Sequence, residues 1–329
     1  AIKLDPHKGE AYNNLGSVLT KLARHSEAVE AFREAARLLP EVIDIEKNLA
    51  NAYFQWERYP DAIKHLEKYL GSRPNDFSAR HLLGLSLFLH GEVGRAIQTL
   101  EDLRSLGRKD MGVLYTLSVA YIRAGRFSEA QDVLASLFKA HSGSAESHLL
   151  LAQALEGQHK YREALDEVNR ALELNPELAL AHFYKGRIYW RQAKAEQAEA
   201  EFSRELQINP KHTDSFYFRG TVRFFEQRFD DAEADFRRAL ELDPQHFPAR
   251  FHLARSLLKM NEYQAAAAHL KKTVQMDPTH SETYYLLGRA LQKMGQAEEA
   301  RKYLERARQL GDQKSRNLRE EFSQAAKPH

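Results

Sequence analysis

The chain has 329 residues, and 48 lysines and arginines nearly balance 46 aspartates and glutamates, for a formal net charge of +2. Such a balance does not indicate a nucleic-acid partner. The sequence has no cysteine, which excludes disulfides, thiolate zinc sites and iron–sulfur clusters and is compatible with either a cytoplasmic or an exported bacterial protein. No apolar run approaches the roughly 18 residues of a membrane-spanning helix, so we expect no membrane insertion of this chain.

An alanine recurs every 34 residues along the chain, without an insertion or deletion. These alanines are Ala28, Ala62, Ala96, Ala130, Ala164, Ala198, Ala232, Ala266 and Ala300. A fixed period of this length predicts a repeat array, which offers one long binding surface rather than a catalytic pocket. With Gly9 as position 1, the predicted units are 9–42, 43–76, 77–110, 111–144, 145–178, 179–212, 213–246, 247–280 and 281–311.

The pattern inside each unit predicts a helical hairpin. Positions 4, 7, 8 and 11 form one helical stripe, and positions 20, 24, 27 and 28 form a second stripe. Position 8 is always small and position 24 always apolar, so we expect the two helices to approach closely there. Proline stands at position 32 in six units and should stop the second helix. Arg108 and Ser142 take its place in the third and fourth units.

The two ends of the chain differ from the units between them. Residues 1–6 match residues 171–176, where a second helix should end, so we expect residues 1–8 to close a preceding repeat of a longer array. Gly311 suits a helix C-terminus. Residues 312–324 are mostly polar and predict a separate capping helix, followed by a frayed tail at 325–329.

The first unit has the full residue pattern of a known repeat family. Its pattern residues are Tyr12, Leu15, Gly16, Ala28, Phe32, Ala35 and Pro40. On these residues the chain resembles the tetratricopeptide repeat family from residue 1 to about 311. The resemblance implies an all-α, right-handed α-solenoid (a superhelix) of helix-turn-helix repeats. It also implies a non-catalytic protein–protein interaction scaffold that binds its partner in a concave groove.

No motif for catalysis or for a cofactor is found in the sequence. A glycine-rich phosphate loop, a Gly-x-Ser-x-Gly motif and a His-Glu-x-x-His motif are all missing. The pairs His141–His148 and His246–His252 have no carboxylate at a recognisable ligand spacing. We therefore expect no catalytic residues, no metal and no cofactor, and we interpret these histidines as solvated or packing residues.

The predicted binding site lies on the inner stripe, which is positions 2, 5, 9, 12 and 13 of each first helix. By the resemblance, this stripe lines the groove. In units six to nine it combines aromatic and arginine side chains, which are typical of binding hot spots. The predicted contact residues are Phe183, Arg187, Trp190, Arg191, Tyr217, Thr221, Phe224, Phe251, Arg255, Tyr285 and Arg289. They favour a protein or peptide partner with apolar and acidic groups, although the same aromatics could simply fill space between neighbouring helices.

A second stretch of the inner stripe lies in units two to four. Its predicted contact residues are Lys47, Asn51, Phe88, Tyr115, Ile122 and Arg123. In some family members, a lysine and an asparagine at the positions of Lys47 and Asn51 begin a clamp for a partner's C-terminal carboxylate. Leu82, Gly112 and Thr116 do not match the rest of that clamp, so we expect it to be absent.

Three cationic residues occupy predicted core positions. Lys185, Arg219 and Arg223 stand at positions 7, 7 and 11 of units six and seven. A buried cation needs a partner, so either these helices are rotated or nearby acids satisfy the cations. The candidate acids are Asp214, Glu226 and Glu205.

Three other functions stay open at this point. Arg187, Arg191, Arg255 and Arg289 could form a track for an anionic polymer such as a polysaccharide. The N-terminal end of the array could receive the C-terminal region of a second copy, and a head-to-tail contact of this kind builds filaments or rings. The array could also be the targeting arm of a larger enzyme.

Overall fold

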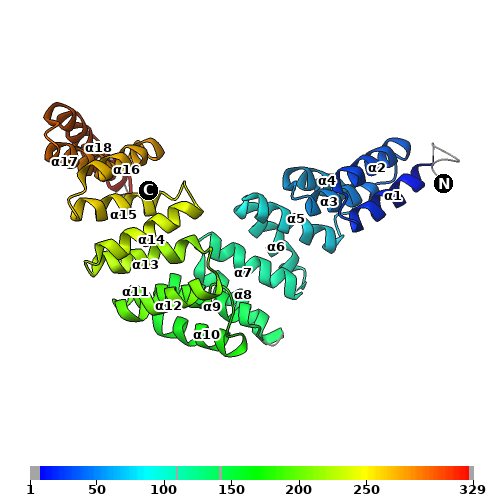
Figure 1. Cartoon of the computed structure of the whole chain (residues 1–329). Helices are drawn as coiled ribbons and strands as arrows, with labels where there is room; N and C mark the ends of the chain where they lie inside the picture. Colours follow the sequence, from blue (N-terminus) through cyan, green and yellow to red (C-terminus); the bar gives the residue numbers. More distant parts are fainter. Residues whose placement is uncertain (1–7, 109, 141–142, 326–329) are drawn as a thin grey trace. The chain divides into compact units, whose positions relative to one another are not determined.

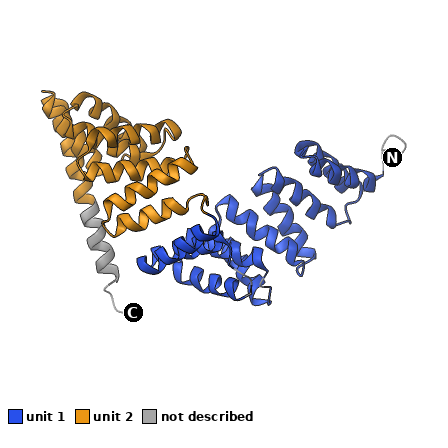
Figure 2. Ribbon diagram, turned by 60° about the horizontal axis from the view of Figure 1, so that its bottom comes forward, with its two compact units in different colours: residues 1–175 blue, residues 176–329 orange. Residues whose placement is uncertain are grey.

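The structure is a computed structural model that describes residues 8–108, 110–140 and 143–325. These ranges contain helices and no strand (Figure 1). The chain divides into two compact units, each of which contains several of the 34-residue repeats. Unit 1 is residues 1–175 and unit 2 is residues 176–329 (Figure 2). None of the helices found in the described ranges is long and apolar enough to cross a membrane.

The helices follow one another as tandem pairs in both units, as an α-solenoid requires. Unit 1 contains α1 (Gly9–Lys21), α2 (His25–Leu38), α3 (Asp44–Gln55), α4 (Tyr59–Ser72), α5 (Phe77–His90), α6 (Val93–Ser105), α7 (Met111–Arg123), α8 (Phe127–Ala140), α9 (Ala145–Gly157) and α10 (Tyr161–Leu174). Unit 2 contains α11 (Ala181–Arg191), α12 (Ala195–Ile208), α13 (Thr213–Phe225), α14 (Phe229–Leu242), α15 (Phe247–Lys259), α16 (Tyr263–Met276), α17 (Ser281–Lys293) and α18 (Ala297–Ala325).

The turn inside each helix pair has one residue in the left-handed region, always at position 15. These residues are Ala23, Glu57, Gly91, Gly125, His159, Ala193, Gln227, Asn261 and Gly295. The amide of position 16 donates to the carbonyl of position 11, as from Arg228 to Arg223 at 2.9 Å. The amide of position 15 donates to position 12, as from Gln227 to Phe224 at 3.0 Å. This Schellman pattern satisfies the last carbonyls of the first helix and ends it.

The two helices of a pair cross where position 8 meets position 24. A Cβ atom added to Gly16 would lie 2.7 Å from the ring of Phe32, and one added to Gly186 would lie 2.7 Å from Phe202. The alanines at position 20 are all fully buried. The small residues thus let the helices approach closely, and a larger side chain would clash in an interior that has no room to spare.

Proline ends the second helices as the pattern predicts. For example, α2 ends at Leu38 before Pro40, and α14 ends at Leu242 before Pro244. Where Arg108 replaces proline, α6 ends at Ser105 and Gly107 takes a φ of +80°. The other replaced position, Ser142, lies outside the described residues.

The C-terminal end differs from the prediction. Helix α18 is continuous from Ala297 to Ala325, so Gly311 does not end it and residues 312–324 do not form a separate helix. A glycine costs a helix interior only about 1 kcal/mol relative to alanine, and no proline follows until Pro328. Gln309, Leu310, Gln313 and Lys314, which are good helix formers, carry the helix through. Of the predicted tail, residues 326–329 lie outside the described residues, as do residues 1–7 at the other end.

Candidate partner-binding surfaces

Several side chains expected on the exposed inner stripe of unit 2 are buried. Phe183 is 5% exposed, and Phe224 and Phe251 are 6% exposed. Thr221 is 6% exposed, and its hydroxyl donates to the carbonyl of Tyr217 at 2.8 Å. The expectation that these four side chains face solvent is therefore wrong, and they pack within unit 2.

Histidines from the loops between helix pairs cover the aromatic residues at position 5. The ring of Phe183 lies 4.7 Å from His212, that of Tyr217 lies 5.2 Å from His246, and that of Phe251 lies 5.0 Å from His280. Each histidine stands at position 34 and precedes the next first helix. The sequence contains this signal as three histidines spaced by one period, but the spacing alone does not show that they cover aromatic rings.

The arginines at position 9 lie against aromatic rings. Arg187 lies 5.4 Å from the ring centroid of Tyr184, and Arg255 lies 4.9 Å from that of Phe224. Arg289 lies 5.9 Å from the ring of Tyr285 and donates to its hydroxyl at 3.0 Å. Such contacts fix a guanidinium while leaving part of its donor edge accessible.

Two aromatic groups of the unit 2 stripe are accessible. Trp190 is half-buried and lies 5.6 Å from Phe225, which neighbours it on the stripe and is 57% exposed. Arg191 beside them is exposed. Farther along the unit, Tyr285 is 46% exposed. We refer to Trp190 and Phe225 as the aromatic pair.

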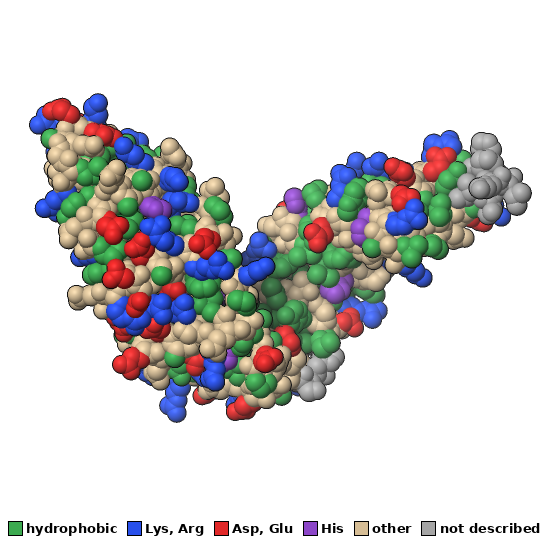
Figure 3. Space-filling view, viewed as in Figure 1, with side chains coloured by type: hydrophobic (Ala, Val, Ile, Leu, Met, Phe, Trp, Pro, Cys, Tyr) green, Lys and Arg blue, Asp and Glu red, His purple; other side chains and the backbone are tan. Residues whose placement is uncertain are grey.

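The inner stripe of unit 1 presents accessible apolar side chains. Tyr115 is 37% exposed, while Phe88 and Ile122 are half-buried. Leu85, Leu89 and Val119 extend the surface, and Leu89 is 42% exposed. We call these residues the apolar strip: Leu85, Phe88, Leu89, Tyr115, Val119 and Ile122. Hydrophobic side chains gather over α5 to α7 in Figure 3, and these helices lie side by side.

One of the predicted contact residues of unit 1, an arginine, borders the apolar strip. Arg123 is exposed and lies 5.2 Å from the ring of Phe88. The other two predicted polar residues of unit 1 are engaged inside the protein. The ammonium of Lys47 lies 2.7 Å from Asp76 and 2.9 Å from Ser78, and Asn51 donates to the carbonyl of Lys47 at 3.0 Å. Lys47 thus ties α3 to the start of α5, and Asn51 is bonded within its own helix.

The cations at core positions of unit 2 are half-buried and paired, but not with the acids that were expected. Arg219 donates twice to Asp235, and Arg223 contacts both Asp235 at 2.9 Å and Glu199 at 2.7 Å. Lys185 lies 3.2 Å from Glu201. Asp214, Glu226 and Glu205 are not their partners; Glu205 accepts the backbone amides of Leu180 and Phe183. The acids that meet positions 7 and 11 come from the adjacent second helices.

Arginine contacts also shift the titration of Glu199. Hydrogen bonds from Arg228 lower the pKa of this carboxyl, burial opposes that effect, and Arg223 lowers the pKa further, to about 2.

Several histidines of both units form ion pairs or pack against rings. Three of them lie 2.6 Å from a glutamate of the same helix pair: His65 with Glu46, His148 with Glu167, and His182 with Glu201. His252 packs 5.7 Å from the ring of Phe236, and burial lowers its pKa to about 4. His141 lies outside the described residues. Among the residues that were searched, no group of three or more histidine and acidic side chains could hold a metal ion.

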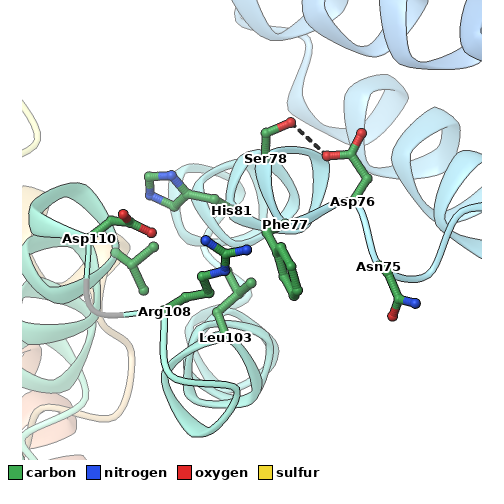
Figure 4. A pocket seen from close by; sticks show the side chains of 9 residues that line it. Asn75, Asp76, Phe77, Ser78, His81, Leu103, Arg108 and Asp110 are labelled. Carbon is green, nitrogen blue, oxygen red and sulfur yellow. Dashed lines mark hydrogen bonds between the residues drawn. The ribbon is translucent and has the colours of Figure 1, made fainter.

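A pocket of about 480 Å³ lies in unit 1 beside the loop between α6 and α7. Its lining residues are Asn75, Asp76, Phe77, Ser78, His81, Leu103, Arg108, Asp110 and Val113 (Figure 4). Sequence reasoning missed this pocket, although Arg108 in place of proline marked the loop as unusual.

Family models and known proteins agree with the helical-pair architecture. Models described as tetratricopeptide repeat match residues 9–41, 149–213, 219–281 and 257–316. A model described as anaphase-promoting complex, cyclosome, subunit 3 matches residues 55–137. The chain belongs to the tetratricopeptide repeat family, a class of protein–protein interaction scaffolds.

The chain is also similar to individual proteins at low sequence identity. The BBSome complex member BBS4 of Bos taurus is 24% identical over 131 residues, which are 40% of this chain and 25% of that protein. The chain thus spans about a quarter of that relative. A tetratricopeptide repeat protein from Parabacteroides merdae has a TM-score of 0.62 at 15% identity and matches 76% of this chain and 98% of that one. A structure of MamA has a TM-score of 0.48 at 19% identity and matches 50% of this chain and 97% of that one.

Proposed function

We propose that the chain is a non-catalytic scaffold that binds a segment of a partner protein along the apolar strip of α5 and α7. The observation that carries the proposal is that Leu89 and Tyr115 stay exposed, while Phe183, Phe224 and Phe251 of unit 2 are buried. Large apolar side chains grouped on a surface are typical of interaction sites. The aromatic pair of unit 2 would be a separate, smaller contact surface.

The partner should present apolar anchors with acidic groups next to them. Apolar anchors fit Tyr115, Val119 and Ile122, and an acidic group fits the exposed Arg123. Arginine binds carboxylates with a planar fork of donors. Ionic contacts at exposed residues weaken with salt, while apolar contacts do not. Affinity should therefore fall only in part as the ionic strength rises.

The test compares two exposed leucines of the same unit. A photo-reactive amino acid is placed at Leu89, on the strip, or at Leu174, which is 58% exposed on α10 and off the strip. The partner should cross-link at position 89 and not at 174. It should also be lost from the Leu89→Glu variant and retained by Leu174→Glu.

Other results would overturn the proposal. Equal recovery by both glutamate variants would move the function away from the apolar strip. Loss of binding on Arg→Gln substitution at 191, 255 and 289, with tolerance of Trp190→Ala, would favour an anionic polymer instead. A mass that rises with protein concentration would favour self-assembly.

A further inference from the structure

The loop between α6 and α7 is built differently from the loops that contain proline. Gly107 takes the left-handed conformation, and its amide donates to Arg104 while that of Arg108 donates to Leu103 at 3.1 Å. This turn sends the side chain of Arg108 over the pocket wall. Its guanidinium carbon lies 4.2 Å from the ring centroid of Phe77.

The Arg108 guanidinium has no acidic partner among the described residues. No carboxylate oxygen of this part of the chain lies within ion-pair distance of it, although Asp76 and Asp110 both line the pocket. Asp76 is engaged by Lys47, Ser78, Tyr69 and the amide of Ala79. Stacking on Phe77 holds the plane of the guanidinium, which leaves its donors for a ligand.

Asp110 occupies a capping position but does not cap. Its counterpart one period earlier, Asp76, accepts the amide of Ala79 at 3.0 Å and so caps α5. At the start of α7, the side chain of Asp110 makes no cap hydrogen bond, although aspartate is one of the preferred N-cap residues. In Figure 4, the Asp110 carboxylate and the Arg108 guanidinium point toward the same central space.

The geometry points to a pocket that binds two opposite charges side by side. We propose that it takes a carboxylate on Arg108 and an ammonium on Asp110, supplied by neighbouring acidic and lysine residues of the partner segment. Phe77, Leu103 and Val113 provide an apolar floor for the aliphatic stems of such residues. A doubly negative group such as phosphate fits less well, because Asp76 and Asp110 would repel its second charge.

The pocket adjoins the surface of the proposed function. His81 lines the pocket and lies one helical turn before Leu85 of the apolar strip. A segment bound along the strip would therefore place its charged pair at this end. The inference rests on the proposed function for the source of the ligand, and its chemistry can be tested without the partner.

The probe is the peptide acetyl-Leu-Glu-Lys-Leu-amide, titrated into the isotope-labelled full chain. Binding is followed through the Nε–Hε signal of Arg108 by NMR. Peptides with glutamine in place of glutamate, of lysine or of both separate the two charges. The protein variants are Arg108→Gln and Asp110→Asn. The control is Arg126→Gln, since Arg126 also stacks on a ring, that of Tyr121 at 4.7 Å, but outside this pocket.

We expect each variant, and each single glutamine peptide, to weaken binding about tenfold. The effects should be coupled: Arg108→Gln should cost nothing further with the peptide that lacks glutamate, and Asp110→Asn nothing further with the one that lacks lysine. Arg126→Gln should bind as the wild type. Circular dichroism should show the same helix content for all variants, because neither pocket residue makes a structural side-chain hydrogen bond in the described chain.

Three outcomes decide the inference. Equal binding of the charged and the doubly neutral peptide would overturn it, and so would uncoupled losses. Saturation of the Arg108 signal by free leucine, with no response to the tetrapeptide, would support the charge-pair chemistry and identify a free amino acid as its source. The cross-link at position 89 is an independent readout, so a failed pocket and a failed apolar strip give different results.

Discussion

Arg219 of α13 and Asp235 of α14 form a two-pronged ion pair, with Nε 3.0 Å from Oδ2 and Nη2 2.6 Å from Oδ1. The side chain of Asp235 is 4% exposed and also contacts Arg223. One carboxylate therefore contacts two cations of unit 2, and Glu199 is a second acidic partner of Arg223.

Replacing Asp235 by asparagine should destabilise unit 2 by about 3 kcal/mol, because it leaves two half-buried arginines without their shared anion. The matched control is Asp231→Asn, since Asp231 pairs with Arg228 at the surface and is 57% exposed. That change should cost less than about 1 kcal/mol. Urea unfolding followed by circular dichroism measures both, and equal costs would contradict the assigned burial.

Substituting glycine for Gln227 should stabilise the protein. Gln227 sits at position 15 with a φ of +64°, a conformation that costs a residue with a Cβ atom about 1–2 kcal/mol and costs glycine little. The control Gln98→Gly lies in the middle of α6 and should instead destabilise by about 1 kcal/mol. Thermal melts of the two variants should thus shift in opposite directions. Shifts in the same direction would refute the strain argument.

Replacing Ala232 by leucine should overpack a helix crossing. Ala232 is fully buried, and extra methylene groups in a filled core cost about 1–3 kcal/mol. Ala268→Leu places the same side chain on the exposed face of α16 and should be nearly neutral. If both variants melt like the wild type, the crossing has more room than the structure shows.

Stability should fall between about pH 6.5 and pH 4 because of His252. Burial lowers the pKa of this imidazole in the folded protein to about 4, against about 6.5 in an unfolded chain. The unfolded state therefore binds the extra proton first as the pH falls. The stabilisation is complete above pH 6.5 and is lost as the pH drops to about 4, by up to about 3 kcal/mol.

The measurement is the unfolding free energy of the wild type and of His252→Gln across that range. The variant should show a shallower dependence on pH, whatever its stability at neutral pH. Parallel curves would mean that His252 is not the group responsible. Since burial likewise lowers the pKa of His269 to about 4, some dependence should persist in the variant.

The fold was predictable because it depends on short-range regularities. These regularities are the period, the small residues at position 8 and the prolines at position 32, and each acts within one helix pair. The structure confirms the crossing of Gly16 with Phe32. The candidate site was predicted less well. Whether Phe183 is exposed depends on His212, one loop away, and the partner of Arg219 comes from a helix face that the stripe pattern does not specify.

Phe183 and His212 stand at two ends of one 34-residue period, as do Tyr217 with His246 and Phe251 with His280. In each contact, the histidine in the loop and the aromatic residue that it covers belong to the same repeat. A segment of one period that was duplicated or deleted whole in this stretch would carry its closing contact with it. Changes in the number of repeats by recombination would therefore preserve the contacts between these histidines and aromatic rings.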